Sequence, residues 1–319
     1  MLISFIIPTY NGDKYLEKCL NSILNQNLKN FEIIIIDWWS KDWTLNIVNK
    51  YLQKDNSIKL IHQKWKWLWN ARNIWIDNAE WEYITFIDCD DFISQNFIDS
   101  FAMKMNEWYD MIIWGFVKYK SEKDSKQIFI KDNWIWKYLD TWPWWRFVKK
   151  SFLKEKNIRF LDNSLREDAH FNITVFNYTR NIAIINYAWY YYRISNNDSM
   201  CKTICRKFDP WFIEWLNKMW EIKPIDDENK EMKNYAIIRA CIFYLLYSWR
   251  YLSSKDFIFE YKKLFKWLKY NISWYWKNKY LRIFTNSENV IIYKIGITWF
   301  ILLDKLHLVP LFARIRCKQ

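Results

Sequence analysis

Glycine is almost missing from this chain. Only Gly12, Gly115 and Gly296 occur among its 319 residues, whereas an average protein contains about 7% glycine. Tryptophan is usually rare, yet this chain contains 24. The scarcity of glycine means that no glycine-rich phosphate loop follows the first predicted strand in the sequence as written, and glycine is the residue that adopts positive φ most readily. Its scarcity also leaves tight turns to bulkier residues that are strained there.

Several tryptophans stand where the backbone favours glycine. Trp38 and Trp39 follow the apolar run 31–37, at the turn that ends a predicted strand, and Trp65 and Trp67 lie in a predicted loop. We therefore interpret most of the tryptophans as glycines of the natural protein, produced when a UGA codon that encodes glycine is read as tryptophan. The alternative is a truly tryptophan-rich chain, selected for stacking on sugars or for membrane contact. UGG codons at most of these positions would contradict the misreading.

The cysteines and histidines predict neither disulfides nor a zinc site. None of the six cysteines forms a CxxC pair, and Cys201 and Cys205 lack two further ligands. Reduced thiols of a cytosolic protein are therefore expected. The chain begins with an apolar strand pattern instead of a signal peptide. Its most apolar stretch, 290–303, is too short to span a bilayer and contains Lys294.

The net charge of +13 favours anionic partners, such as nucleotide phosphates, nucleic acid or an acidic membrane surface. The basic residues are scattered and form no nucleic-acid-binding motif, so no nucleic acid partner is expected. The stretch 290–303, with the basic tail 314–318, can place the C-terminal region against a membrane surface. The alternative is that 290–303 is a core helix.

Strand and helix patterns alternate over the first 120 residues. The strands are continuous apolar runs, as in sheets buried on both faces, and the helices have apolar residues at helical spacing. This alternation predicts parallel βαβ units, which bind ligands beyond the carboxyl ends of their strands. The predicted strands are 3–8, 31–37, 58–62 and 82–88, and the predicted helices are 14–25, 42–53, 70–78 and 95–106.

Polar residues follow the first two predicted strands. Pro8, Thr9, Tyr10 and Asn11 end the first strand, where the tyrosine can stack on a nucleobase. Asp37 ends the second strand and can accept hydrogen bonds from a base or a ribose. Taken alone, such a tetrapeptide is also an ordinary strand-to-turn transition.

The acidic group Asp88, Asp90 and Asp91 is the sharpest feature of the chain. Two carboxylates at i and i+2 after a buried strand can converge on one hard cation, and Mg²⁺ or Mn²⁺ prefers such oxygen ligands. The alternative is a solvated acidic turn. Further on, Glu167 and Asp168 precede a helical pattern, where a carboxylate acts either as a helix cap or as a general base that deprotonates a hydroxyl group.

Taken in order, these residues resemble the family 2 glycosyltransferases, GT-A-fold enzymes that build bacterial surface polysaccharides. The likeness covers about residues 1–195 and is far more specific than any single motif. The family pattern expects glycine or another small residue at positions 39, 67, 75 and 81, and each is tryptophan here. The motifs that carry the likeness are Ile6-Ile7-Pro8-Thr9-Tyr10-Asn11, Asp37-x-x-Ser40-x-Asp42-x-Thr44, Asn70-Ala71-Arg72-Asn73-Ile74, Asp88-Cys89-Asp90-Asp91-Phe92 and Glu167-Asp168.

The resemblance also implies which tryptophans are genuine. Family members often have Pro-Trp-Gly ahead of a basic residue, where this chain has Pro143-Trp144-Trp145-Arg146. We therefore interpret Trp144 as genuine and Trp145 as a glycine. If Trp38 and Trp39 are genuine tryptophans, their two indoles crowd the nucleotide site.

The resemblance implies a GT-A (Rossmann-like) α/β catalytic domain over 1–205, with a mostly parallel sheet flanked by helices, followed by a helical, basic C-terminal region over 206–319. It implies an inverting, metal-dependent transfer of a hexose-type sugar from a nucleotide-sugar, foremost a UDP-sugar, with Mn²⁺ or Mg²⁺ as cofactor. The acceptor would be a glycan or a lipid-linked molecule of cell-envelope polysaccharide synthesis. The enzyme would be cytoplasmic or peripheral at the inner face of the membrane.

The resemblance assigns roles residue by residue. The Pro8–Asn11 segment, with Tyr10, and Asp37 would hold the base and ribose, and Arg72 would lie near the diphosphate. Asp88 would contact the ribose or the metal ion. The metal would be ligated by Asp90 with help from Asp91, and Asp168 would be the catalytic base with Glu167 beside it.

Two other functions fit parts of the pattern. A non-catalytic carbohydrate- or membrane-binding protein on a degenerate GT-A scaffold would suit genuine tryptophans, but it has no need of Asp37, Asp88, Asp90 and Asp168. A nucleotidyltransferase would also use carboxylates and Mg²⁺, but the first strand is not followed by a glycine-rich phosphate loop. Release of pyrophosphate instead of UDP would identify it.

Overall fold

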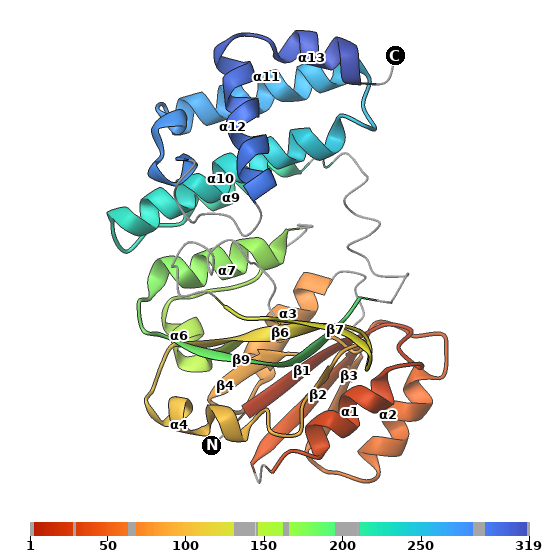
Figure 1. Cartoon of the computed structure of the whole chain (residues 1–319). Coiled ribbons are helices and arrows are strands. Elements are labelled where there is room, and N and C mark those ends of the chain that lie inside the picture. The colour runs from red at the N-terminus through yellow and green to blue at the C-terminus, as the bar shows by residue number, and fades with distance from the viewer. Residues whose placement is uncertain are drawn as a thin grey trace. The chain divides into compact units, whose positions relative to one another are not determined.

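A computed structural model gives the fold of the chain (Figure 1). The residues that it describes are 3–27, 30–62, 68–130, 144, 146–161, 166–194, 209, 211–282 and 291–317. The chain divides into two compact units, the first comprising 1–132, 141–175 and 179–196, and the second comprising 133–140, 176–178 and 197–319. The boundary expected between 205 and 206 falls outside the described residues.

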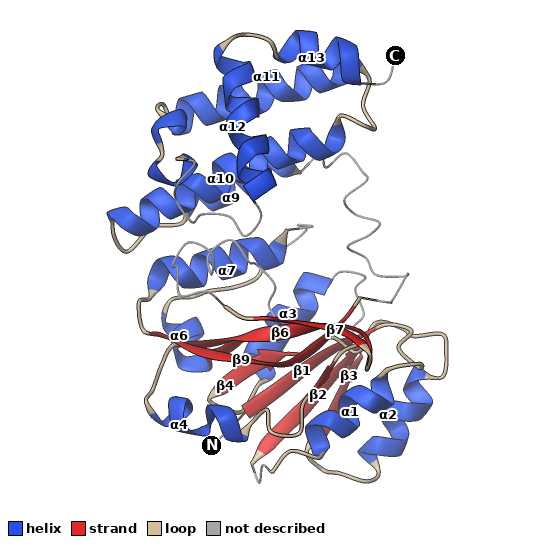
Figure 2. Cartoon of the chain, in the orientation of Figure 1, coloured by secondary structure: helices blue, strands red, loops and turns tan. Residues whose placement is uncertain are grey.

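A mixed sheet forms the centre of the first unit (Figure 2). Within the described residues it has nine strands in the order β3-β2-β1-β4-β8-β6-β9-β5, with β7 paired to β6. The strands β1 to β4 run parallel. The strands are β1 Ile3–Thr9, β2 Phe31–Asp37, β3 Ile58–His62, β4 Tyr83–Phe86, β5 Phe92–Ile93, β6 Met111–Ser121, β7 Asp124–Ile128, β8 Arg146–Lys149 and β9 Ile182–Arg193.

Helices flank this sheet, as the sequence predicts. Helix α2 contacts β3, and α3 contacts β1. The isoleucines of β2 are buried throughout, because a parallel strand in the middle of a sheet has both faces covered. The helices of this part of the chain are α1 Leu16–Leu24, α2 Thr44–Leu52, α3 Leu68–Asn78, α4 Asp99–Asn106, α6 Lys150–Glu155 and α7 Glu167–Tyr178.

The predicted bounds hold best for β1, β2 and β3. The fourth strand is shorter than predicted and ends at Phe86, so the acidic group lies in the turn beyond it. Helix α4 begins at Asp99 rather than at 95, because residues 95–98 form turns.

One glycine of the sheet is required by close packing. A Cβ atom at Gly115 would lie 2.4 Å from the backbone oxygen of Ile128 and 3.0 Å from that of Tyr187. Gly115 also lies where the register between β6 and β9 shifts. No larger residue fits at this crossing of three backbone segments.

The second unit is helical. Two of its helices begin at side-chain caps, Asp226 accepting from the amide of Asn229 and Ser253 accepting from the amide of Asp256, as expected at helix N-termini. Its helices are α9 Phe212–Glu221, α10 Asp227–Ser248, α11 Ser254–Asn271, the 3-10 helices η2 Tyr275–Lys277 and η3 Lys279–Leu281, α12 Ile291–Lys305 and α13 Val309–Arg316.

No individual helix within the described residues has both the length and the apolar composition to cross a membrane. The segments Ile292–Lys305 and Val309–Arg316 satisfy that test only when taken together, and the chain bends by 117° between them.

Candidate functional site

The first part of the site lies where β1 and β2 end. Their parallel register pairs Thr9 with Asp37, and Asp37 in turn pairs with His62 on β3. The backbone amide of Trp38 donates to the carbonyl of Thr9 over 3.0 Å. The sheet therefore brings the predicted Pro8–Asn11 segment and Asp37 together at one edge.

Asp37 is fully buried at this edge. Its Oδ2 accepts a hydrogen bond from the amide of Ser40 over 3.2 Å, and Nδ1 of His62 lies 4.0 Å from the same oxygen. Its Oδ1 is buried and has no hydrogen-bond partner among the described residues. Buried carboxylate oxygens normally have partners, so this oxygen can accept a hydrogen bond from a bound molecule.

The predicted residues before it have different surroundings. The Tyr10 ring is 53% exposed and free to stack on a ligand. Asn11 instead joins the two strand ends, since its amide donates to Oγ of Ser40 and its Oδ1 accepts from the amide of Lys41. Thr9 is buried and its hydroxyl donates to the carbonyl of Ile7.

The turn after Asp37 contains a strained tryptophan. Trp39 has a φ of 59°, in the left-handed region where a side chain is unfavourable. Its indole is 67% exposed, so no core packing accounts for a large residue here. This backbone is what the glycine interpretation predicts for position 39.

The acidic turn after β4 forms a tight cluster. Asp88, Asp90 and Asp91 each present a carboxylate oxygen, and these oxygens all lie within 4.8 Å of one another. Asp91 is buried, while the other two are partly exposed. Burial and the negative charge of Asp90 raise the pKa of Asp88 to about 7. Three carboxylates at this spacing repel one another and attract a cation.

Strand β9 holds this turn in place. The Tyr190 hydroxyl donates to Oδ2 of Asp91 over 2.7 Å and accepts from the amide of Asp88 over 3.2 Å. The Arg193 amide donates to Oδ1 of Asp91 over 2.7 Å, and its Nε donates to the carbonyl of Asp90 over 2.8 Å. Both oxygens of Asp91 therefore have protein partners.

The acidic turn also touches the end of β1. The backbone of Tyr10 lies close enough to the Cys89 thiol to oppose the rise of its pKa that burial causes, and a Cβ atom at Gly12 would lie 3.2 Å from the Cys89 Sγ. The first two predicted parts of the site are thus neighbours.

Arg72 and Glu167 form a buried ion pair. Nη1 of Arg72 lies 2.8 Å from Oε1 of Glu167, and the two side chains are 7% and 10% exposed. The Arg72 guanidinium also stacks on Phe160, with Cζ 5.1 Å from the ring centroid. Its Nε is buried without a partner among the described residues, so it retains a donor for an anion.

Asp168 lies within the electrostatic reach of three arginines. Burial raises the pKa of its carboxyl group, and the charges of Arg72, Arg166 and Arg146 oppose that rise. The negative charge of Asp168 in turn raises the pKa of Asp88, which places the predicted base close to the acidic cluster. Burial also raises the pKa of Glu167 to about 7, against the charge of Arg72.

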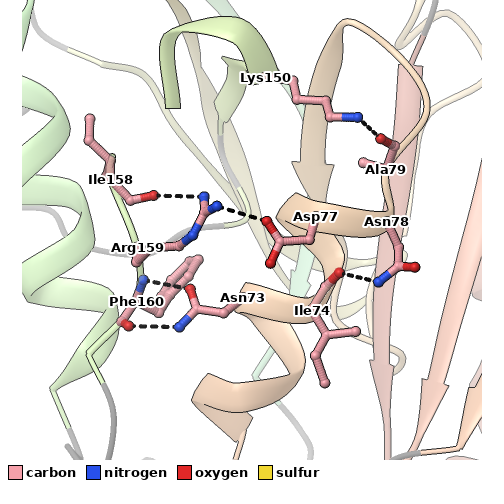
Figure 3. Close-up of polar contacts among 9 residues, drawn as sticks. All are labelled: Asn73, Ile74, Asp77, Asn78, Ala79, Lys150, Ile158, Arg159 and Phe160. Atoms are coloured by element: carbon pink, nitrogen blue, oxygen red, sulfur yellow. Dashed lines mark hydrogen bonds and ion pairs between the residues drawn. The ribbon is translucent and has the colours of Figure 1, made fainter. Parts of the chain in front are cut away.

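Helix α3 binds the segment that precedes α7 through hydrogen bonds and an ion pair (Figure 3). Nδ2 of Asn73 donates to the carbonyl of Phe160 and its Oδ1 accepts from the Phe160 amide, both over 2.9 Å. One turn further along the helix, Asp77 pairs with Arg159 over 2.7 Å. Asn73 follows Arg72 directly, so these bonds hold the helix that carries Arg72 against the segment that carries Phe160.

The sequence did not predict four residues of the site: Asn73, Arg146, Tyr190 and Arg193. Asn73 and Arg146 lie in motifs that the resemblance quotes, but no role followed from them. Tyr190 belongs to a tyrosine cluster, Tyr190–Tyr192. In the sequence this cluster indicates a β-strand and no particular function.

Comparisons with known proteins agree with this arrangement. The pattern of the family described as Glycosyl transferase family 2 matches residues 4–180, more than half of the chain. The chain is 27% identical over 239 residues to the uncharacterized glycosyltransferase EpsJ of Bacillus subtilis, covering 70% of this chain and 68% of EpsJ. It is 28% identical over 286 residues to the GalNAc(5)-diNAcBac-PP-undecaprenol beta-1,3-glucosyltransferase of Campylobacter jejuni, covering 85% and 89%.

Among solved structures, the fold resembles TarS of Staphylococcus aureus in complex with UDP. The TM-score is 0.58 at 22% identity, over 75% of this chain and 71% of that chain. This likeness confirms the predicted fold class, an α/β sheet flanked by helices with a helical C-terminal region.

Proposed function

Because the chain belongs to glycosyltransferase family 2, whose pattern covers residues 4–180, we propose that it is an inverting, metal-dependent enzyme that uses a UDP-sugar. Its acceptor is a glycan or lipid-linked molecule of cell-envelope polysaccharide synthesis. The observation that carries the proposal is the acidic cluster Asp88, Asp90 and Asp91, which lies within electrostatic reach of Arg72 and Asp168.

The nucleotide site is assigned to the ends of β1 and β2. The Oδ1 of Asp37, which has no partner within the part of the chain that the structure describes, would accept a hydrogen bond from the base or the ribose. The exposed ring of Tyr10 would stack on the base. The choice of UDP is supported by TarS, which has been solved with UDP and with UDP-GlcNAc. Trp39 lies at the edge of this site, and a glycine there would leave room for the nucleotide.

Asp88 and Asp90 would hold the divalent ion, with Asp91 in support. Their carboxylate oxygens suit Mg²⁺ or Mn²⁺. Both oxygens of Asp91 are already bonded to Tyr190 and Arg193, so its main task is to shape the turn. A bound ion would stabilise the negative charge that develops on the leaving diphosphate. Arg72 adds positive charge, and its Nε, which has no hydrogen-bond partner among the described residues, can donate to the diphosphate.

Asp168 is the proposed base and Glu167 is not. Glu167 is committed to Arg72, and its charge positions that guanidinium. Asp168 would take the proton of the acceptor hydroxyl as its oxygen attacks the anomeric carbon. The new glycosidic bond forms on the face opposite the breaking bond to the β-phosphate oxygen, so the configuration inverts and UDP leaves.

The acceptor and the location rest on a relative. The Campylobacter jejuni enzyme is named for an undecaprenol-linked acceptor, which supports a lipid-linked acceptor for this chain as well. Such an acceptor would place the enzyme in the cytoplasm, at the inner face of the membrane. Nucleic acid is not a proposed partner.

Calorimetric titration of UDP into the full-length protein tests the donor site. We expect binding with Mn²⁺ present, and we expect its loss both with a chelator and in Asp90→Asn. The matched control is Asp99→Asn, an exposed aspartate at the start of α4, which should bind as the parent does. A folded parent protein that binds no UDP would favour the non-catalytic scaffold.

A further inference from the structure

An uncovered apolar face runs along α12 and α13 of the second unit. On α12 and the turn after it, Ile292, Ile295, Leu302 and Leu306 are 64%, 57%, 51% and 55% exposed. Their spacing of three, seven and four residues places them on one side of the helix. Trp299 falls on the same stripe, and the face stays apolar whether position 299 is tryptophan or glycine.

Helix α13 continues the pattern. Leu308, Leu311 and Ile315 are spaced by three and four residues and are 38%, 53% and 69% exposed. The chain bends by 117° between the two helices, so each helix carries its own stripe, and we call the two stripes together the apolar face. Monomeric proteins rarely expose so many large aliphatic side chains side by side without a partner.

The other side of α12 is fixed to the helical unit. Asp304 is buried and accepts hydrogen bonds from the hydroxyls of Tyr261 and Tyr275, and Nζ of Lys269 lies 2.9 Å from its Oδ1. Ile297 and Phe300 are also buried. The helix therefore cannot turn its apolar face inward without breaking this network.

The exposed charges of α12 and α13 themselves have one sign. Asp304 is the sole acidic residue between 291 and 317, and it is buried in the network just described. The exposed charged residues of α12 and α13 are the cations Lys305, Arg314 and Arg316. An apolar stripe bordered by cations fits an anionic lipid surface. A second copy of the chain would instead bring like charges together, because a two-fold interface places the same patch on both sides.

We propose that the apolar face of α12 and α13 docks on an anionic membrane surface. The helices lie in the plane of the lipid headgroups, with the aliphatic side chains in the acyl boundary and Lys305, Arg314 and Arg316 against the phosphates. This inference deepens the proposed function, since a lipid-linked acceptor lies at such a surface. Its test measures vesicle binding rather than UDP binding or sugar transfer, so the two can fail separately.

Co-sedimentation with vesicles tests the aliphatic part of the face. The full-length protein is mixed with vesicles of phosphatidylcholine alone or of phosphatidylcholine with phosphatidylglycerol. We expect binding to the anionic vesicles, and about tenfold weaker binding for Leu302→Glu or Ile295→Glu. Phe259→Glu is the matched control, because Phe259 is 66% exposed on α11 and should bind as the parent does. Thermal unfolding of each variant verifies that it is folded.

A pair of double variants tests the cations. Arg314→Gln with Arg316→Gln should weaken binding to anionic vesicles by roughly fivefold for each cation removed. Lys123→Gln with Lys126→Gln, at the exposed β6–β7 turn, removes the same net charge and should change little. If both double variants lost the same amount of binding to anionic vesicles, the net charge of the protein alone would explain the loss. That result would overturn the proposal.

Two further results would overturn it. One is a parent protein that does not bind anionic vesicles. The other is a dimer, seen by sedimentation velocity without lipid, that Leu302→Glu dissociates, because the apolar face would then cover a second copy. Both measurements use the same protein preparations as the vesicle assay.

Discussion

At the residue scale, four of the described tryptophans form two contrasting pairs. Trp39 and Trp108 have φ values of 59° and 60° and are 67% and 59% exposed. Trp114 and Trp144 are buried, and Trp144 stacks on Tyr190 with ring centroids 4.5 Å apart. The left-handed backbone favours glycine in the first pair. The packing of the core favours a genuine indole in the second pair.

This division predicts opposite effects of glycine at two positions. Trp39→Gly should raise the free energy of unfolding by about 1 kcal/mol, because it removes left-handed strain without a loss of packing. Trp144→Gly should lower it by about 3–5 kcal/mol, because it empties a filled core site. Urea unfolding of the two variants measures both changes. A loss of stability in Trp39→Gly would contradict the glycine interpretation at that position.

The charge of Arg72 should set the acid limb of the pH–rate profile. Asp168 can accept a proton only when it is ionised, and burial raises its pKa, so the rate should fall as the pH drops through that raised value. The positive charge of Arg72 lowers this pKa. Arg72→Met should therefore move the acid limb to higher pH, whereas Arg72→Lys, which keeps the charge, should move it less.

The measurement is the rate of UDP release as a function of pH for the parent and the two variants. A uniform fall in rate without any shift of the limb would mean that Arg72 acts on donor binding alone.

At the scale of elements, the sequence predicted what depends on local pattern. The strands β1, β2 and β3 are continuous apolar runs, and their bounds were predicted to within one residue. The strands β6, β8 and β9 were not predicted, because the regular alternation of strand and helix patterns in the sequence ends before them. The candidate site follows the same rule: the strand-end carboxylates were visible in the sequence, whereas Tyr190 and Arg193 depend on how β9 pairs.

The bonds between α3 and the segment before α7 should contribute to stability. Asn73→Ala removes both hydrogen bonds to the backbone of Phe160. The amide and carbonyl groups of Phe160 then lose these partners. We expect the free energy of unfolding to fall by about 1–3 kcal/mol. Asn78→Ala is the control, because Asn78 is exposed on the same helix and its Nδ2 donates within that helix, to the carbonyl of Ile74 (Figure 3).

Urea unfolding and amide hydrogen exchange check this prediction. Protection at Phe160 should fall in Asn73→Ala and stay unchanged in Asn78→Ala. Equal destabilisation by the two variants would show that α3 loses helix stability in general and that the link to Phe160 carries no special weight.

At the scale of the whole molecule, the proposed site should couple ligand binding to stability. A ligand that binds only the folded state, at about 100 times its dissociation constant, stabilises a protein by about 2.7 kcal/mol. UDP and Mn²⁺ together should therefore raise Tm by a few degrees, and either one alone should raise it less. A chelator should remove the effect, and Asp90→Asn should not show it. Equal protection by UDP in the presence of the chelator would contradict a metal-bridged donor.

The hydrogen bonds between β9 and the acidic turn also have a consequence for synthesis on the ribosome. Asp91 lies near the start of the chain, but its partners Tyr190 and Arg193 follow about a hundred residues later. A nascent chain can complete β1 to β4 while these partners are still inside the exit tunnel. Contacts at such sequence separation form late in folding. The growing polypeptide therefore acquires the shaped acidic turn only after Arg193 has emerged.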